Sequence, residues 1–128
     1  DTSIATTAFV TGAIATAIPY KKYVILISQA GTSAPTATVL ENTLGQTVTF
    51  SYLGIGQYRL TSTGTPFITN KSAILINFTS GFGQGAYGFR TSSFSINSID
   101  LYTFSNISLS TLSNDILNSA TLEIRVYP

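Results

Sequence analysis

Leu122-Glu123-Ile124-Arg125-Val126, near the end of the sequence, alternates aliphatic and charged residues. Successive side chains of a β-strand point to opposite faces, so the aliphatic residues here share one face and the charged residues share the other. Gln57-Tyr58-Arg59-Leu60-Thr61 repeats this pattern, with Tyr58 and Leu60 on its apolar face. The two stretches predict strands that each cover one side of a hydrophobic core.

Residues 20–128 contain further strand signals, in which β-branched and aromatic residues lie between clusters of Gly, Pro and Asn. The run Tyr23-Val24-Ile25-Leu26-Ile27 is apolar on both faces, which predicts a central strand or contact with a neighbouring chain. The expected strands are 22–28, 36–40, 47–52, 57–62, 73–78, 88–96, 99–104 and 121–127, with one capped helical turn at 113–118. About eight short strands at this spacing predict an all-β fold, an antiparallel β-sandwich or jelly roll.

Charged residues are scarce in this sequence. They make up 9% of the 128 residues, whereas hydrophobic residues make up 44%. An average domain has about 25% charged residues, and a soluble monomer covers much of its surface with them. We therefore expect a surface of Ser, Thr, Asn and Gln that is partly covered by another copy of the chain.

The composition also argues against several classes of protein. The net charge is +1 and Lys21-Lys22 is the only adjacent pair of cations, so we expect no nucleic-acid partner, which would need several phosphate contacts. The longest apolar run is far shorter than the ~20 residues of a membrane-spanning helix, so we expect no membrane insertion. Because Cys and His are absent, we expect no disulfide, no metal site and no cofactor.

Residues 1–19 follow a different pattern, in which apolar residues recur every four positions before Pro19. This spacing places them on one stripe of a helix, and the proline ends that helix. A helix this short is marginal alone, so it would form by packing. We expect 1–19 to be a short helical shaft or assembly segment and 20–128 to be a β-sandwich tip domain. The stripe residues expected at an interface between chains are Phe9, Val10, Ala13, Ile14 and Ile18.

The stretch Asp1-Thr2-Ser3-Ile4-Ala5-Thr6-Thr7-Ala8-Phe9-Val10 resembles a segment that recurs in tail-fibre and related virion proteins of bacteriophages. The usual form is Asp, a polar pair, any residue, Ile or Val, and then Ala-Thr-Thr-Ala-Phe-Val. Ile4 follows Ser3 directly here, so the front of the segment is one residue shorter, but six consecutive residues are identical. Residues 23–45 and 122–127 are also similar to virion proteins of tailed phages.

This resemblance to phage fibre proteins implies a parallel homotrimer with a β-rich tip on the surface of the virion. It implies a role in host attachment. The implied partners are further copies of the chain, other virion proteins, and a host cell-surface glycan or outer-membrane component. The resemblance does not separate a tail fibre from a head fibre.

The glycine-rich stretch 81–90 contains the candidate receptor-binding residues. Glycines let a backbone bend and approach a partner closely. Phe82 and Tyr87 could stack on a sugar ring, while Gln84 and Arg90 could form hydrogen bonds with its hydroxyls. The alternative is a turn whose aromatic residues fold back into the core, because most turns carry no function.

Residues suited to catalysis are few. Glycoside hydrolysis needs two carboxylates within ~5–10 Å. Of the five carboxylates, Asp1 is terminal, Asp115 resembles a helix cap and Glu123 lies beside Arg125, which leaves Glu41 and Asp100. A Ser-His pair is excluded because there is no His. We therefore expect no enzyme and no catalytic residues. An inter-subunit groove that joins Glu41 to Asp100 would instead favour a glycan depolymerase.

Two kinds of function remain. The first is a homotrimeric virion fibre domain, structural and involved in attachment to a host glycan, with a purely structural head-fibre or decoration domain as its variant. The second is a bacterial carbohydrate-binding module or adhesin domain. The second kind is expected to be monomeric and to lack a shaft-like N-terminal segment.

Overall fold

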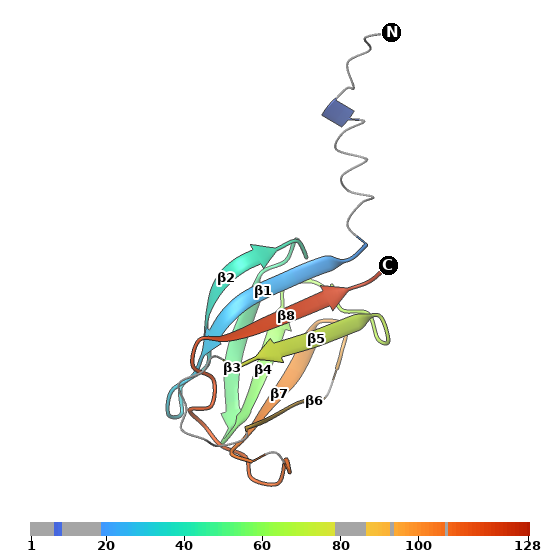
Figure 1. The fold of residues 1–128 in the computed structure, drawn as a ribbon. Coiled ribbons are helices and arrows are strands. Elements are labelled where there is room, and N and C mark those ends of the chain that lie inside the picture. Colours follow the sequence, from blue (N-terminus) through green and yellow to red (C-terminus); the bar gives the residue numbers. More distant parts are fainter. Residues whose placement is uncertain (1–6, 9–18, 79–86, 93, 107) are drawn as a thin grey trace.

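The computed structural model describes residues 7–8, 19–78, 87–92, 94–106 and 108–128, which contain eight strands in two sheets (Figure 1). The first sheet has the order β2-β1-β8-β5 and consists of β1 (Lys21–Ser28), β2 (Thr36–Asn42), β5 (Ser72–Asn77) and β8 (Ala120–Val126). The second has the order β3-β4-β7-β6 and consists of β3 (Val48–Gly54), β4 (Gln57–Ser62), β6 (Gly88–Ser92) and β7 (Ser98–Phe104). Every strand pairing is antiparallel.

The predicted all-β class is thereby confirmed as two antiparallel sheets of four strands. The strands follow the predicted segments in chain order. The jelly-roll topology and the trimer stay predictions. Of the expected N-terminal helix only Thr7 and Ala8 are described, and the interface residues Phe9, Val10, Ala13, Ile14 and Ile18 lie outside the described residues, so this segment also stays a prediction.

The core lies between the two sheets, as the alternating patterns predicted. In β8, Leu122 and Ile124 are fully buried, and in β4, Tyr58 and Leu60 are fully buried as well. β1 is a central strand between β2 and β8, which confirms one of the two explanations for its apolar sequence. The inner face of β1 contributes Tyr23, Ile25 and Ile27 to the core, while its outer face is half-buried.

Two local predictions were wrong. The strand predicted at 88–96 ends at Ser92, because a polar turn follows in which the backbone N–H of Ser95 donates to the carbonyl oxygen of Ser98. The helical turn predicted at 113–118 is absent, because Asp115 has a φ of 62°, in the left-handed region that a right-handed helix does not contain. Asp115 caps a turn instead, since its Oδ1 accepts the N–H of Gly31 at 2.7 Å.

The chain enters and leaves the sandwich at the same end. Lys21 at the start of β1 pairs with Val126 at the end of β8, and the rings of Tyr20 and Tyr127 lie 5.2 Å apart (Figure 1). We call this the proximal end. The opposite, distal end contains the β1–β2 turn, the β3–β4 turn and the connection from β7 to β8. The β3–β4 turn packs closely against the connection from β7 to β8 at Gly56, where an added Cβ would lie 2.6 Å from backbone atoms of Ser113 and Thr103.

Candidate functional site

The predicted receptor-binding residues are only partly described. Phe82 and Gln84 lie outside the described residues. Tyr87 is half-buried, and its ring centroid lies 6.4 Å from that of Phe78. Arg90 is exposed and belongs to β6, so it is part of a sheet face rather than of a loop.

The outer face of the β3-β4-β7-β6 sheet brings Arg90 close to polar residues from two other strands. Arg90 of β6 lies across from Tyr102 of β7, and Tyr102 lies across from Gln57 of β4. In the neighbouring row, Ser92 lies across from Asp100, and Asp100 lies across from Arg59. Residues directly opposite in antiparallel strands share a face, and adjacent rows lie within side-chain reach. We call this surface the arginine face, formed by Gln57, Arg59, Arg90, Ser92, Asp100 and Tyr102.

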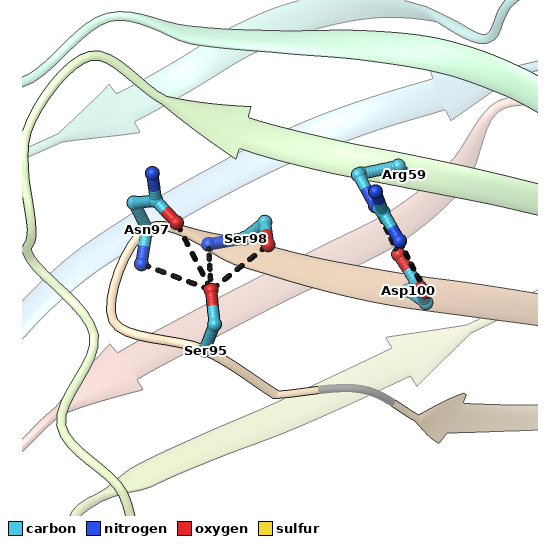
Figure 2. A network of polar contacts seen from close by, with 5 residues as sticks. All are labelled: Arg59, Ser95, Asn97, Ser98 and Asp100. Carbon is cyan, nitrogen blue, oxygen red and sulfur yellow. Dashed lines mark hydrogen bonds and ion pairs between the residues drawn. The ribbon is translucent and has the colours of Figure 1, made fainter.

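Arg59 and Asp100 form a bidentate ion pair on this face (Figure 2). The Nε of Arg59 donates to Oδ1 of Asp100 at 2.6 Å, and its Nη2 donates to Oδ2 at 2.9 Å. The side chain of Asp100 is only 5% exposed, whereas that of Arg59 is 43% exposed. The hydrogen bonds and charge of Asp100 raise the pKa of Arg59, which stays cationic. The pair therefore neutralises a buried carboxylate and leaves Nη1 of Arg59 without a hydrogen bond to any described residue.

Arg90 has a different environment, because it lies over aromatic rings. Its guanidinium carbon is 5.2 Å from the ring centroid of Tyr102 and 5.7 Å from that of Phe104. Contact with ring faces holds a guanidinium in place while its N–H groups stay able to donate. Within the described part of the chain, Arg90 forms no ion pair with a carboxylate. The arginine face therefore has two cations and one anion.

A polar turn precedes the strand that carries Asp100 and Tyr102 (Figure 2). The Oγ of Ser95 accepts the N–H of Ser98 at 3.0 Å and lies 2.9 Å from the Oγ of Ser98 and 3.0 Å from Oδ1 of Asn97. A side-chain oxygen that binds the backbone two or three residues later stabilises a turn. This turn leads directly into β7, whose pairing with β4 and β6 places Asp100 and Tyr102 on the arginine face.

A second polar cluster lies at the distal end and is centred on Gln29, which is 6% exposed. Its Oε1 accepts the hydroxyl of Tyr58 and the backbone N–H of Asp115, both at 2.8 Å. Its Nε2 donates to the carbonyl oxygens of Gly31 at 2.7 Å and Ser33 at 3.2 Å. Gln29 therefore ties the β1–β2 turn to β4 and to the segment before β8. No sequence pattern singled it out, because its partners lie far away along the chain.

A wide hollow of about 800 Å³ lies at the proximal end, where the chain enters the sandwich. Pro19, Tyr20, Tyr127 and Pro128 contribute to its lining. The guanidinium of Arg125 lies 5.0 Å from the ring centroid of Tyr20 at this end. Pro19, at which the chain enters the sandwich, is itself part of this lining.

The carboxylates considered for catalysis lie apart in one chain. Glu41 belongs to β2, where its Oε2 lies 2.8 Å from Nζ of Lys22, and Asp100 belongs to the other sheet. Glu123, which was expected to point outward beside Arg125, forms an ion pair with it. No group of three or more acidic, His or Cys side chains suited to a metal ion occurs among the described residues. In the same part of the chain, no helix has the length and hydropathy needed to cross a bilayer.

Comparison of the sequence and the fold with protein-family models, with curated proteins and with solved structures finds no match.

Proposed function

We propose that this chain is the homotrimeric tip domain of a bacteriophage virion fibre and that its arginine face attaches to an acidic glycan of the host surface. The observation that carries the proposed contact is Arg90, which is exposed, stacked on Tyr102 and Phe104, and not paired with a described carboxylate. The support for a fibre is the resemblance of residues 1–10 and the scarcity of charge.

The chemistry of the arginine face suits a sugar carboxylate. A guanidinium binds a carboxylate through two parallel N–H···O hydrogen bonds. Arg90 is held over its aromatic rings before a ligand arrives, so little side-chain entropy is lost on binding. Gln57 and Ser92 flank Arg90 and Asp100 on the same face and can bind neighbouring hydroxyls.

The path of the chain suits a domain at the end of a fibre. The sandwich is entered and left at the proximal end, so the distal loops lie at the end remote from a shaft that joins at Tyr20. Three copies on one fibre, and several fibres on one particle, would bind with high avidity even if each contact has low affinity. Each arginine face can therefore be a weak site on its own.

The glycan part of the proposal is tested by calorimetric titration with oligogalacturonate, a carboxylated oligosaccharide, and with its methyl ester, which has lost the charge. We expect binding of the acid and not of the ester. Arg90→Gln should weaken binding at least about tenfold, the effect of losing ~1.4 kcal/mol. Lys71→Gln is the matched control, because it removes one positive charge from an exposed residue of the proximal β4–β5 connection. Equal affinities of the two variants would contradict the proposal.

The fibre part is tested by molar mass in solution, measured by light scattering after size exclusion, for the full chain and for a chain that starts at Tyr20. We expect a trimer for the full chain and weaker association or aggregation for the shorter one. If both are monomers, the bacterial carbohydrate-binding module or adhesin domain becomes the better explanation.

A further inference from the structure

A shallow depression of about 410 Å³ lies at the distal end, between the β1–β2 turn and the segment that leads into β8. It is separate from the arginine face, which belongs to the other sheet. Its volume falls within the ~300–1,000 Å³ usual for small-molecule sites. Its lining includes Ser28, Ala30, Ser33, Ala34, Asp115 and Asn118.

The two walls of this depression are fixed to each other before any ligand binds. Buried Gln29 accepts the N–H of Asp115 on one wall and donates to the carbonyl oxygens of Gly31 and Ser33 on the other. The N–H of Gly31 then donates back to Oδ1 of Asp115 at 2.7 Å. A site whose backbone is held in this way loses little entropy when a ligand arrives.

Asp115 is exposed and held in an uncommon conformation. Its φ of 62° lies in the left-handed region, and Ser119 follows with a φ of 49°. Residues in this region are uncommon and gather at sites where the surrounding structure imposes them. Oδ1 of Asp115 is occupied by Gly31, but Oδ2 has no hydrogen bond to a described residue. The depression therefore includes an ionisable acceptor oxygen that the described protein does not use.

We infer that this depression binds one neutral sugar ring of a glycan, with Oδ2 of Asp115 accepting a hydrogen bond from a sugar hydroxyl. The hydroxyl of Ser33 can both donate and accept, as hydroxyl-rich ligands require. The methyl groups of Ala30 and Ala34 leave room for a flat ring and contact its C–H face. A carboxylate repels acidic sugars, so the ligand class differs from that of the arginine face. The inference therefore goes beyond the proposed function and holds whether or not Arg90 binds a glycan.

The test is an NMR titration of the full ¹⁵N-labelled chain with methyl α-glucoside, methyl α-galactoside and methyl α-mannoside. We expect at least one glycoside to shift the amide signals of residues 28–36 and 115–119 in a saturable way. Asp115→Asn should weaken that binding at least tenfold. Asn also tolerates a positive φ and keeps an oxygen for Gly31, so the thermal midpoint should not change.

Glu41→Gln is the matched control, since it neutralises a partly exposed carboxylate on another surface, and it should bind as the unmodified protein does. Ala34→Phe fills the depression without touching its polar groups, and it too should abolish binding. The inference is overturned if no glycoside shifts these amides, or if either the Asp115→Asn or the Ala34→Phe variant binds as the unmodified protein does. The Arg90→Gln titration with oligogalacturonate is a separate measurement, so the two proposals can fail independently.

Discussion

The two strands that flank β1 each contain an Ala-Thr pair and a Leu-Glu pair, but their surroundings are very different. β2 contains Ala37-Thr38-Val39-Leu40-Glu41 and β8 contains Ala120-Thr121-Leu122-Glu123-Ile124, and both pair with β1 in antiparallel fashion. β8 buries Leu122 and Ile124 completely. β2 leaves Val39 53% exposed and Leu40 57% exposed.

Position in the sheet accounts for this difference. β8 has a neighbour on each side, β1 and β5, and its inner residues meet the opposite sheet. β2 is an edge strand, and its pairing with β1 shifts register so that Leu40 is an extra residue between Glu41 and Val39. Such a bulge twists an edge away from further pairing. Similar local sequences therefore contribute differently to the free energy of unfolding.

The largest expected effect separates Ile124→Ala from Val39→Ala. Ile124 is fully buried in a packed core, so its truncation should cost about 3 kcal/mol of unfolding free energy through lost transfer energy and a cavity. Val39→Ala should cost less than about 0.5 kcal/mol, because half of the side chain is already in water. Urea denaturation measures both. A Val39→Ala cost near that of Ile124→Ala would mean that another copy covers β2 in solution.

The next effect is a loss of stability at alkaline pH, which originates at Tyr23, the residue of β1 that lies across from Ile124. Burial raises the pKa of Tyr23 above its ordinary value. In the unfolded chain a Tyr ionises near pH ~10, so the contribution of this group is complete below that pH and is lost as the pH rises through the folded-state pKa. Tyr23→Phe should therefore lose less unfolding free energy than the unmodified protein between pH ~9 and pH ~11. Equal losses would assign the alkaline effect to other tyrosines, such as Tyr58, whose pKa burial also raises.

A smaller effect is expected for Leu40→Lys on the edge strand. Leu40 is mostly exposed, so the unfolding free energy should stay within about 0.5 kcal/mol. A lysine on an edge strand discourages pairing between copies, so less protein should aggregate on heating. Light scattering during a thermal ramp measures this. A fall in the molar mass of the unheated protein would instead place β2 in the assembly interface.

The smallest effect is expected for the outward carboxylates of the same two strands. Glu41→Gln removes an ion pair with Lys22, and Glu123→Gln removes one with Arg125. The four side chains are between 23% and 43% exposed to solvent. Ion pairs this accessible contribute little to the free energy of unfolding. Each variant should shift the thermal midpoint by less than about 2 °C. A larger shift for Glu123→Gln alone would show that the difference between β8 and β2 extends to their outer faces.

The candidate surfaces were harder to predict than the strands. Arg90 was singled out from a glycine-rich stretch, but its contacts are with Tyr102 and Phe104 of β7, and these depend on the pairing of β6 with β7. Asp100 was considered together with Glu41, whereas its partner is Arg59 in the adjacent strand. Asp115 was expected to cap a helix, and it caps the β1–β2 turn instead. In each case the sequence pattern identified the residue but not the residue that it contacts in the fold.

By itself, the sequence determined the all-β class, the approximate position of each strand and the faces on which Tyr58, Leu60, Leu122 and Ile124 lie. These properties follow from side-chain alternation, which depends only on neighbouring residues. The tertiary structure alone decided the strand order, the exposure of β2, the ion pair of Arg59 with Asp100 and the burial of Gln29. These depend on the register between strands distant in sequence, where many arrangements satisfy the same alternation and only the packing of the whole core selects one.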